Sequence, residues 1–147
     1  MKYLSLFLLS SMLIFSSCSK GPKPIDFGHE NCHYCKMLIA DPKFGAEAVS
    51  KTGKVFKYDA VECLIMDLKS GGIEKDKMAD YYVIAFDKPG TLIPASEATF
   101  LISQKLPSPM GAYLSAFSSR ESAEAKSREK GGELYSWEEV RKKITGN

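Results

Sequence analysis

The sequence is short of the features that mark several common functional classes. Lysine and arginine total 20 against 18 aspartate and glutamate residues, so no excess of positive charge indicates a nucleic-acid partner. A glycine-rich phosphate loop and an H-E-x-x-H motif are both absent. Only two histidines, His29 and His33, are present, and both lie beside cysteines. Because no catalytic constellation is visible elsewhere, we do not expect an enzyme.

Hydrophobic runs long enough to cross a bilayer are also lacking. The apolar stretch at residues 3–15 is shorter than the roughly 20 residues that a spanning helix needs. It follows Lys2 and ends in small residues before Cys18, the pattern of a bacterial lipoprotein signal. We therefore expect residues 1–18 to be a signal peptide ending at a lipidated Cys18, and the mature chain to be anchored on the periplasmic side of a bacterial membrane. An ordinary secretory signal is the alternative.

The residues after Cys18 differ in character from both the signal and the rest of the chain. Residues 19–28 are polar and rich in proline and glycine, which is typical of a flexible tether. About 130 residues remain after the signal, enough for one core or two very small ones. We assign residues 29–147 to the folded domain.

Cysteine is too scarce for a disulfide framework. If Cys18 is lipidated, only Cys32, Cys35 and Cys63 remain, whereas an exported disulfide-stabilised domain normally has a larger, even number. Three thiols allow one bridge at most and leave one cysteine over. They therefore need another explanation.

The hydrophobic pattern predicts an α+β fold with antiparallel sheets and a few helices. Two strands around a Thr-Gly turn are expected within residues 46–59. A helix is expected to start at Asp59, to use Glu62 in a variant capping box, and to end at the Gly-Gly pair at 71–72.

A similar order is expected in the second half of the chain. Strands are predicted at 81–87, 98–103, 110–119 and 132–137, and helices at 120–132 and from residue 136 onward. The last helix has a capping box formed by Ser136 and Glu139. Because a strand pair leads into a helix that ends at Gly-Gly twice, we expect two similar ββα-type halves, about 29–78 and 79–147.

The segment NCHYCKML contains the motif Cys32-x-x-Cys35-x-Met37. Haem attachment is excluded, because that motif requires histidine directly after the second cysteine. A structural zinc site would need Cys63 and a histidine to complete four ligands, but Cys63 falls on a mostly apolar helix, where buried free thiols are common. A thiol–disulfide oxidoreductase remains an alternative, although the residues after Cys35 are a poor helix.

Methionine two residues after a cysteine indicates a different chemistry. If residues 35–39 form a strand, Cys35 and Met37 point to the same side. Thiolate and thioether together are a soft donor set that favours Cu(I). The predicted metal ligands are therefore Cys35, Met37 and Cys32. Further ligands could come from His33, His29 or the more distant Met110.

Three segments, CHYCKMLI, KVFKYDAVECLIMDL and PMGAYLSAFSSRESAEAKSREKGG, resemble the NosL family of accessory lipoproteins of nitrous oxide reductase. The similarity runs from about residue 32 to residue 144. Within it Cys35 and Met37 match the family's metal-binding motif and Cys32 matches the preceding cysteine. Family members typically have Cys-Gly-Met where this chain has Lys36 between the two ligands.

The resemblance implies a fold and a function. The fold would be two similar ββα-type halves, like the non-catalytic part of organomercurial lyase. The function would be that of a membrane-anchored periplasmic copper chaperone, which binds Cu(I) and passes it to the machinery that matures nitrous oxide reductase or a related copper enzyme. The implied partners are the accessory proteins of that machinery and, through the lipid anchor, the membrane.

Overall fold

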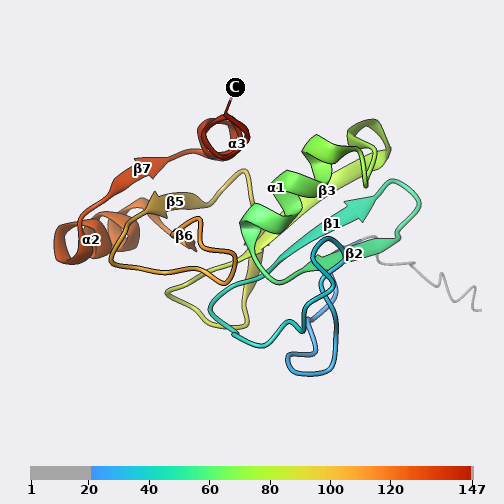
Figure 1. The fold of residues 1–147 in the computed structure, drawn as a ribbon, viewed down its shortest axis with the longest axis horizontal. Helices are drawn as coiled ribbons and strands as arrows, with labels where there is room; N and C mark the ends of the chain where they lie inside the picture. The colour runs from blue at the N-terminus through green and yellow to red at the C-terminus, as the bar shows by residue number, and fades with distance from the viewer. Residues whose placement is uncertain (1–20, 147) are drawn as a thin grey trace, which may run out of the picture.

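The computed structural model describes residues 21–146, which form two antiparallel sheets side by side, with helices packed on them (Figure 1). The expected signal peptide, Cys18 and the first two tether residues lie outside the described part. The elements, in chain order, are β1 (Ala46–Ser50), β2 (Val55–Tyr58), α1 (Val61–Ser70), a short 3-10 turn (Lys75–Lys77), β3 (Met78–Ile84), β4 (Leu92–Pro94), β5 (Thr99–Ile102), β6 (Leu114–Phe117), α2 (Arg120–Lys130), β7 (Glu133–Tyr135) and α3 (Trp137–Thr145). Within residues 21–146, no helix has the length and apolar character needed to cross a membrane.

The two sheets repeat one arrangement. The first has the strand order β2-β1-β3-β4 and the second the order β6-β5-β7, with all neighbouring strands antiparallel. Each half therefore runs strand, strand, helix, strand, and in each the first strand lies between the second and the third. This confirms the α+β class and the two similar halves. Because β3 and β4 complete the first sheet, the halves divide between β4 and β5 and not at residue 78.

The first hairpin and the last helix form where local sequence signals place them. β1 and β2 pair across a turn closed by hydrogen bonds between Ser50 and Lys54, with Gly53 at a φ of 88°. Ser136 and Glu139 form the reciprocal capping box of α3. Both predictions are confirmed, because both signals act within a few residues of chain.

The start of α1 differs from its prediction. The helix begins at Val61 after Ala60, which has an extended backbone and offers no side-chain cap. The carboxylate of Glu62 accepts a hydrogen bond from the Ser108 hydroxyl in the other half. The predicted capping role of Asp59 and Glu62 is therefore wrong, because a tertiary contact takes the carboxylate that a local cap would have used.

Two strand predictions need correction. The strand expected at 81–87 is β3, which starts three residues earlier and ends at Ile84. The strand expected at 110–119 is reduced to β6, and Met110 lies in a turn before it. The turn contains two residues in the left-handed region, Gly111 at φ 76° and Tyr113 at φ 57°, and such backbone is incompatible with a continuous strand.

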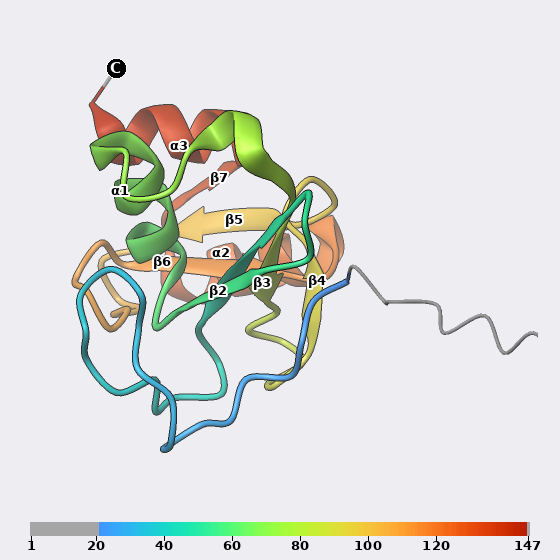
Figure 2. The same cartoon turned by 90° about the vertical axis from the view of Figure 1, so that its right-hand side faces the viewer.

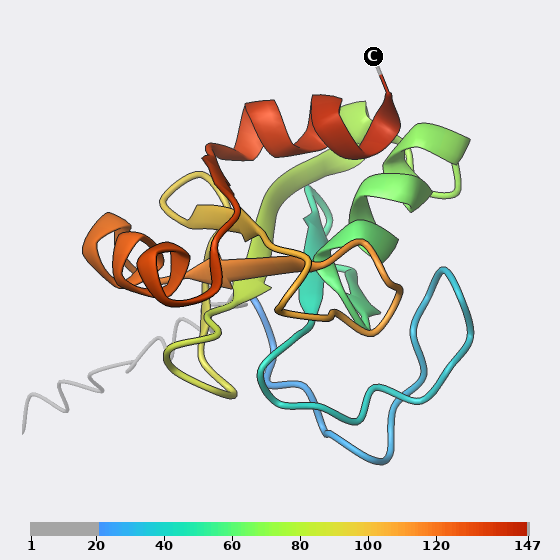
Figure 3. The ribbon, with the colours of Figure 1, turned by 60° about the vertical axis from the view of Figure 1, so that its left-hand side comes forward.

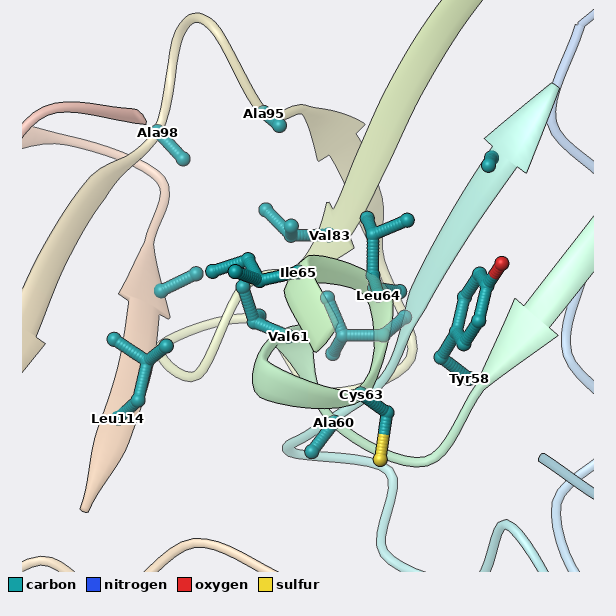
Figure 4. Packing of buried hydrophobic residues seen from close by; sticks show 14 of the residues in the cluster. Tyr58, Ala60, Val61, Cys63, Leu64, Ile65, Val83, Ala95, Ala98 and Leu114 are labelled. Carbon is teal, nitrogen blue, oxygen red and sulfur yellow. The ribbon is translucent and has the colours of Figure 1, made fainter. Parts of the chain in front are cut away.

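One hydrophobic cluster extends across both halves. Helix α1 contributes Val61, Leu64 and Ile65, which pack between strands of the two sheets (Figure 4). Elsewhere in the cluster, the centroid of the Trp137 ring lies 5.8 Å from that of Tyr81 in β3 and 5.7 Å from that of Phe100 in β5. Since aromatic rings bury large apolar areas, this stack stabilises the junction of the two sheets.

The segment before the first sheet is part of the fold. Residues 21–28 belong to the predicted tether, yet Ile25 is buried in the main cluster and packs beside Gly45. The Lys23 backbone N–H donates to the carboxylate of Glu47 in β1, and the Lys57 ammonium donates to the carbonyl of Pro24. These residues cover the face of β1 that points away from α1, and the folded domain therefore begins earlier than expected.

Glu47 makes stability depend on pH. It has 0% of its surface exposed, and burial raises the pKa of its carboxyl from 4.5 to about 7 despite the nearby Lys23 and Lys57. The folded state therefore holds this proton up to a higher pH than the unfolded state. The protonated Glu47 carboxyl therefore makes its full contribution to stability below about pH 4.5, and this contribution is lost as the pH rises through about 7. The free energy of unfolding changes by about 3 kcal/mol over this range.

We therefore expect Glu47→Gln to raise the free energy of unfolding at pH 8 relative to the parent protein, and to leave it nearly unchanged at pH 5. Urea unfolding at both pH values measures the difference. Glu97→Gln, on an exposed turn, is the control and should shift neither value. An equal effect of Glu47→Gln at both pH values would contradict the assignment.

Candidate metal centre

The loop that carries the cysteine motif is a closed turn and not a strand. The Cys32 N–H donates to the Met37 carbonyl and the Lys36 N–H to the Cys32 carbonyl, and Asn31 bridges to Leu38. Lys36 adopts a φ of 65°, a conformation that glycine takes without steric cost. The expectation that Cys35 and Met37 share one face of a strand is therefore wrong, because the chain reverses direction between residues 32 and 37.

Backbone hydrogen bonds dock this loop against the first sheet. The His33 N–H donates to the Lys57 carbonyl of β2, while the Ile39 N–H donates to the Glu30 carbonyl and joins the two ends of the loop. Figures 2 and 3 show the segment before β1, drawn in blue to cyan, extending beyond the sheets beneath the first turn of α1. As a result Cys32 points inward and is 1% exposed, whereas Cys35 on the turn is half-buried.

Cys63 completes a group that the sequence did not predict. It lies in the first turn of α1, 1% exposed, and Figure 4 shows its sulfur pointing away from the aliphatic side chains of the cluster. The sulfur atoms of Cys32, Cys35 and Cys63 all lie within 4.8 Å of one another, and all three are free thiols. The signal that was available is the odd count: a third mature cysteine with no partner for a second bridge.

Neither histidine joins the group of thiols. The Nδ1 atom of His33 lies 2.9 Å from the buried carboxylate of Asp67, which also accepts a 2.8 Å hydrogen bond from the Tyr58 hydroxyl. Its ring packs edge-on against Phe56 at 4.9 Å. His29 is exposed and lies 3.0 Å from the carboxylate of Asp26. His33 therefore supports the loop through its contacts with Asp67 and Phe56, and His29 lies at the surface.

The three thiols alter one another's pKa values. Cys63 donates a hydrogen bond to the sulfur of Cys32, and backbone N–H groups of Asp59 and Cys35 add to it, so the pKa of Cys32 falls to about 5 despite burial. The same hydrogen bond and burial raise the pKa of Cys63. Burial, with the neighbouring Cys32 thiolate, raises the pKa of Cys35. The contacts among the three sulfur atoms therefore favour ionisation of Cys32 before Cys35 or Cys63.

Methionines lie on the cysteine loop and on the loop of the other half that neighbours Cys63. Met37, directly after the turn, is 55% exposed, and Met110 on the neighbouring loop is 40% exposed. Met110 also lines a hollow of about 350 Å³ together with Cys63, Met66 and Tyr34. The hollow places the thioethers of Met66, from the first half, and Met110, from the second half, beside Cys63. The donor set offered by this region is therefore rich in sulfur.

The chain is similar to known proteins over most of its length. The sequence model of the NosL family matches residues 24–145, nearly the whole described part. The chain belongs to the NosL family. As a NosL protein it is 29% identical over 153 residues to the copper-binding lipoprotein NosL of Stutzerimonas stutzeri, a match that covers 90% of this chain and 78% of that protein.

A solved structure of the family has the same fold. The crystal structure of the copper chaperone NosL from Shewanella denitrificans superimposes with a TM-score of 0.64 at 29% sequence identity. The match covers 81% of this chain and 94% of that one. The arrangement of the two halves is therefore that of an experimentally determined NosL protein.

The different burial of the three thiols predicts different rates of modification. We expect a neutral maleimide to modify Cys35 about tenfold or more faster than Cys32 or Cys63, because a buried thiol reacts only after local opening. This order should hold although Cys32 has the lowest pKa. Peptide mapping by mass spectrometry over time measures each residue separately. In denaturant the three rates should converge, and equal rates in the native protein would contradict the burial.

Proposed function

We propose that this protein is a periplasmic Cu(I) chaperone, which binds the ion and passes it to another protein without catalysing a reaction. The observation that carries the proposal is the meeting of Cys32, Cys35 and Cys63 within 4.8 Å at the edge of the fold. Thiolates are soft ligands that favour Cu(I) over harder divalent ions. The names of the two NosL relatives, a copper-binding lipoprotein and a copper chaperone, support the same conclusion.

The proposed ligands are the three thiolates. With metal–sulfur bonds of roughly 2.3 Å, three sulfur atoms around one ion lie about 4 Å apart, so only small side-chain movements are required here. Cys63 thus takes the position that His33 or His29 was expected to fill. Thiols bind Cu(I) as thiolates and release their protons on binding, so Cu(I) affinity rises with pH.

Met37 and Met110 are proposed as ligands for entry and exit. Both are partly exposed; Met110 lines the same hollow as Cys63, and Met37 lies two residues after Cys35 on the cysteine loop. An exposed thioether can hold Cu(I) while one thiolate is released, and a donor from the partner can then take the vacant position. A fully buried cage would block such an exchange, whereas the half-buried Cys35 leaves one side accessible.

Delivery is proposed to occur at the membrane. If Cys18 carries the lipid, only two residues separate it from residue 21, where the folded part described here begins. The anchor then holds the thiol group close to the membrane and raises its concentration near a membrane-bound acceptor. We propose the maturation machinery of nitrous oxide reductase, or of a related copper enzyme, as that acceptor.

Ligand substitutions test the proposed function. In a competition titration of the reduced protein with a Cu(I) chelator, Cys35→Ser and Cys63→Ser should each lower the affinity by about 100-fold or more, since loss of even an outer-shell partner costs 10–100-fold. Met37→Leu removes a thioether while keeping the volume. It should lower affinity by about tenfold at most and slow transfer to an acceptor more strongly.

Leu38→Ala is the matched control, because Leu38 is equally exposed on the same loop and has no sulfur. It should leave the Cu(I) affinity unchanged, because it removes apolar surface and no sulfur donor. If the parent protein has no higher affinity for Cu(I) than the Cys35→Ser variant, the chaperone proposal is wrong. Thiol–disulfide exchange that survives Met37→Leu, combined with such weak binding, would favour the oxidoreductase alternative.

A further inference from the structure

A cleft of about 690 Å³ lies directly beside the cysteine loop. One wall is the turn between β1 and β2, with Gly53 and Lys54, and the other is the loop itself, with Cys32 and His33. The rings of His33 and Phe56, which pack edge-on at 4.9 Å, also line it. The cleft is therefore a concave site with an aromatic surface that reaches a proposed copper ligand.

The charge of this cleft is strongly positive. Lys23, Lys36, Lys54 and Lys57 line it, and Glu30 is its one acidic side chain. Glu30 already forms a 2.7 Å ion pair with Lys57, so these two charges cancel. Within residues 21–146, no carboxylate forms an ion pair with the other three lysines. The Lys54 ammonium instead lies 4.5 Å above the Phe56 ring, and the Lys36 ammonium donates to the His33 carbonyl.

This local charge is not a property of the whole molecule. The chain as a whole has a formal net charge of only +2. The three lysines without a carboxylate partner come from separate segments, namely the N-terminal segment, the cysteine loop and the β1–β2 turn, and the fold brings them to one cleft. Focused charge in a concave site raises the encounter rate of ligands with the opposite charge.

Exposed apolar side chains follow the cysteine motif along its loop and occur on the loop near Cys63. Among the described residues, the large hydrophobic side chains that are exposed are Met37, Leu38 and Met110. Two follow the cysteine turn directly, and the third lies on the loop beside Cys63. An apolar centre with a charged border is the usual anatomy of a protein–protein interface.

We propose that the lysine-lined cleft receives an acidic segment of the protein that accepts Cu(I), and thereby aligns the acceptor's sulfur ligands with the cysteine loop. This inference rests on the proposed chaperone function and adds to it the chemistry of the partner. Carboxylates of the acceptor pair with Lys23 and Lys54, and its apolar surface covers Met37 and Leu38. An extended protein segment can enter a concave site, whereas a flat layer of lipid headgroups reaches only its rim.

Two synthetic peptides test the proposal. Both carry the same two methionines as Cu(I) acceptors, and these are flanked by aspartates in one peptide and by lysines in the other. Copper leaving the loaded full-length chain is followed by stopped-flow absorbance of the copper–thiolate band. The aspartate peptide should remove copper about tenfold faster at low salt, and the advantage should shrink at about 0.5 M salt.

A charge-reversed protein provides the internal check. In a variant with Lys23→Glu and Lys54→Glu, the preference should reverse toward the lysine peptide, while Cu(I) affinity in the chelator titration should stay that of the parent. The control variant has Lys75→Glu and Lys105→Glu, two exposed lysines that line other hollows. It carries the same change of net charge and should keep the preference for the aspartate peptide.

The other outcomes overturn the inference. Equal rates for the two peptides, or an equal response of the control variant, would mean that the cleft does not select an acidic partner. The lysines would be assigned to membrane binding by two results together. The peptide rates would be equal, and binding to phosphatidylglycerol vesicles would be weaker for the variant with Lys23→Glu and Lys54→Glu than for the parent. Failure of the parent chain to bind Cu(I) would remove the proposed function alone. The cleft is then judged by calorimetric binding of the metal-free aspartate peptide.

Discussion

The docking of the cysteine loop onto the first sheet is the contact on which the site depends. A backbone hydrogen bond from His33 to the Lys57 carbonyl fixes the loop beside the end of β2, and α1 starts shortly after that strand. This brings Cys32 and Cys63, separated by 30 residues of chain, into one buried contact. The same docking leaves Cys35 on the outer side of the turn. Burial of two thiols and partial exposure of the third thus have one structural cause.

Buried carboxylates support this edge of the fold and make it sensitive to pH. Asp67 accepts hydrogen bonds from Tyr58 and holds His33 in place behind the loop. Glu62 ties the start of α1 to the loop of the other half through Ser108. Burial raises the pKa of Asp59 to about 6, and that of Glu62 also lies above its ordinary value. Buried carboxyl groups at this edge therefore position the loops. Ionisation of Asp59 or Glu62 in its buried environment destabilises the folded state.

The two halves have become different while keeping one topology. The first half carries two of the thiols on its loop and the third on its helix, and its covering N-terminal segment adds Lys23 to the cleft. The second half contributes Met110 from the loop before β6, and α3 packs against α1. A carrier needs a site that is protected yet open to exchange. The junction of the halves provides the protection, and the loops at its edge provide the opening.

Sequence reasoning reached the features whose physical causes are local. The β1–β2 turn and the Ser136–Glu139 capping box follow from interactions within a few residues, and the soft chemistry of the sulfur side chains follows from their composition. Motif similarity added the family and its fold. By contrast, the predicted strand after Cys35, the cap of α1 and the extent of the tether were wrong. The strand was replaced by a turn with Lys36 in the left-handed region. The cap and the tether each depended on a partner elsewhere in the fold, namely Ser108 and Glu47.

The amino-acid sequence by itself thus determined that the protein has too few cysteines for a disulfide scaffold and a sulfur motif suited to a soft metal. Only the tertiary structure decided which sulfur atoms meet. Cys63 looked like an ordinary core thiol on an apolar helix face, and its burial is indeed complete. The sequence did not reveal the direction in which the Cys63 side chain points. Whether side chains of distant segments meet depends on how helix, strand and loop pack, and not on spacing along the chain. The lysine-lined cleft was hidden for the same reason, since its charges come from three separate segments.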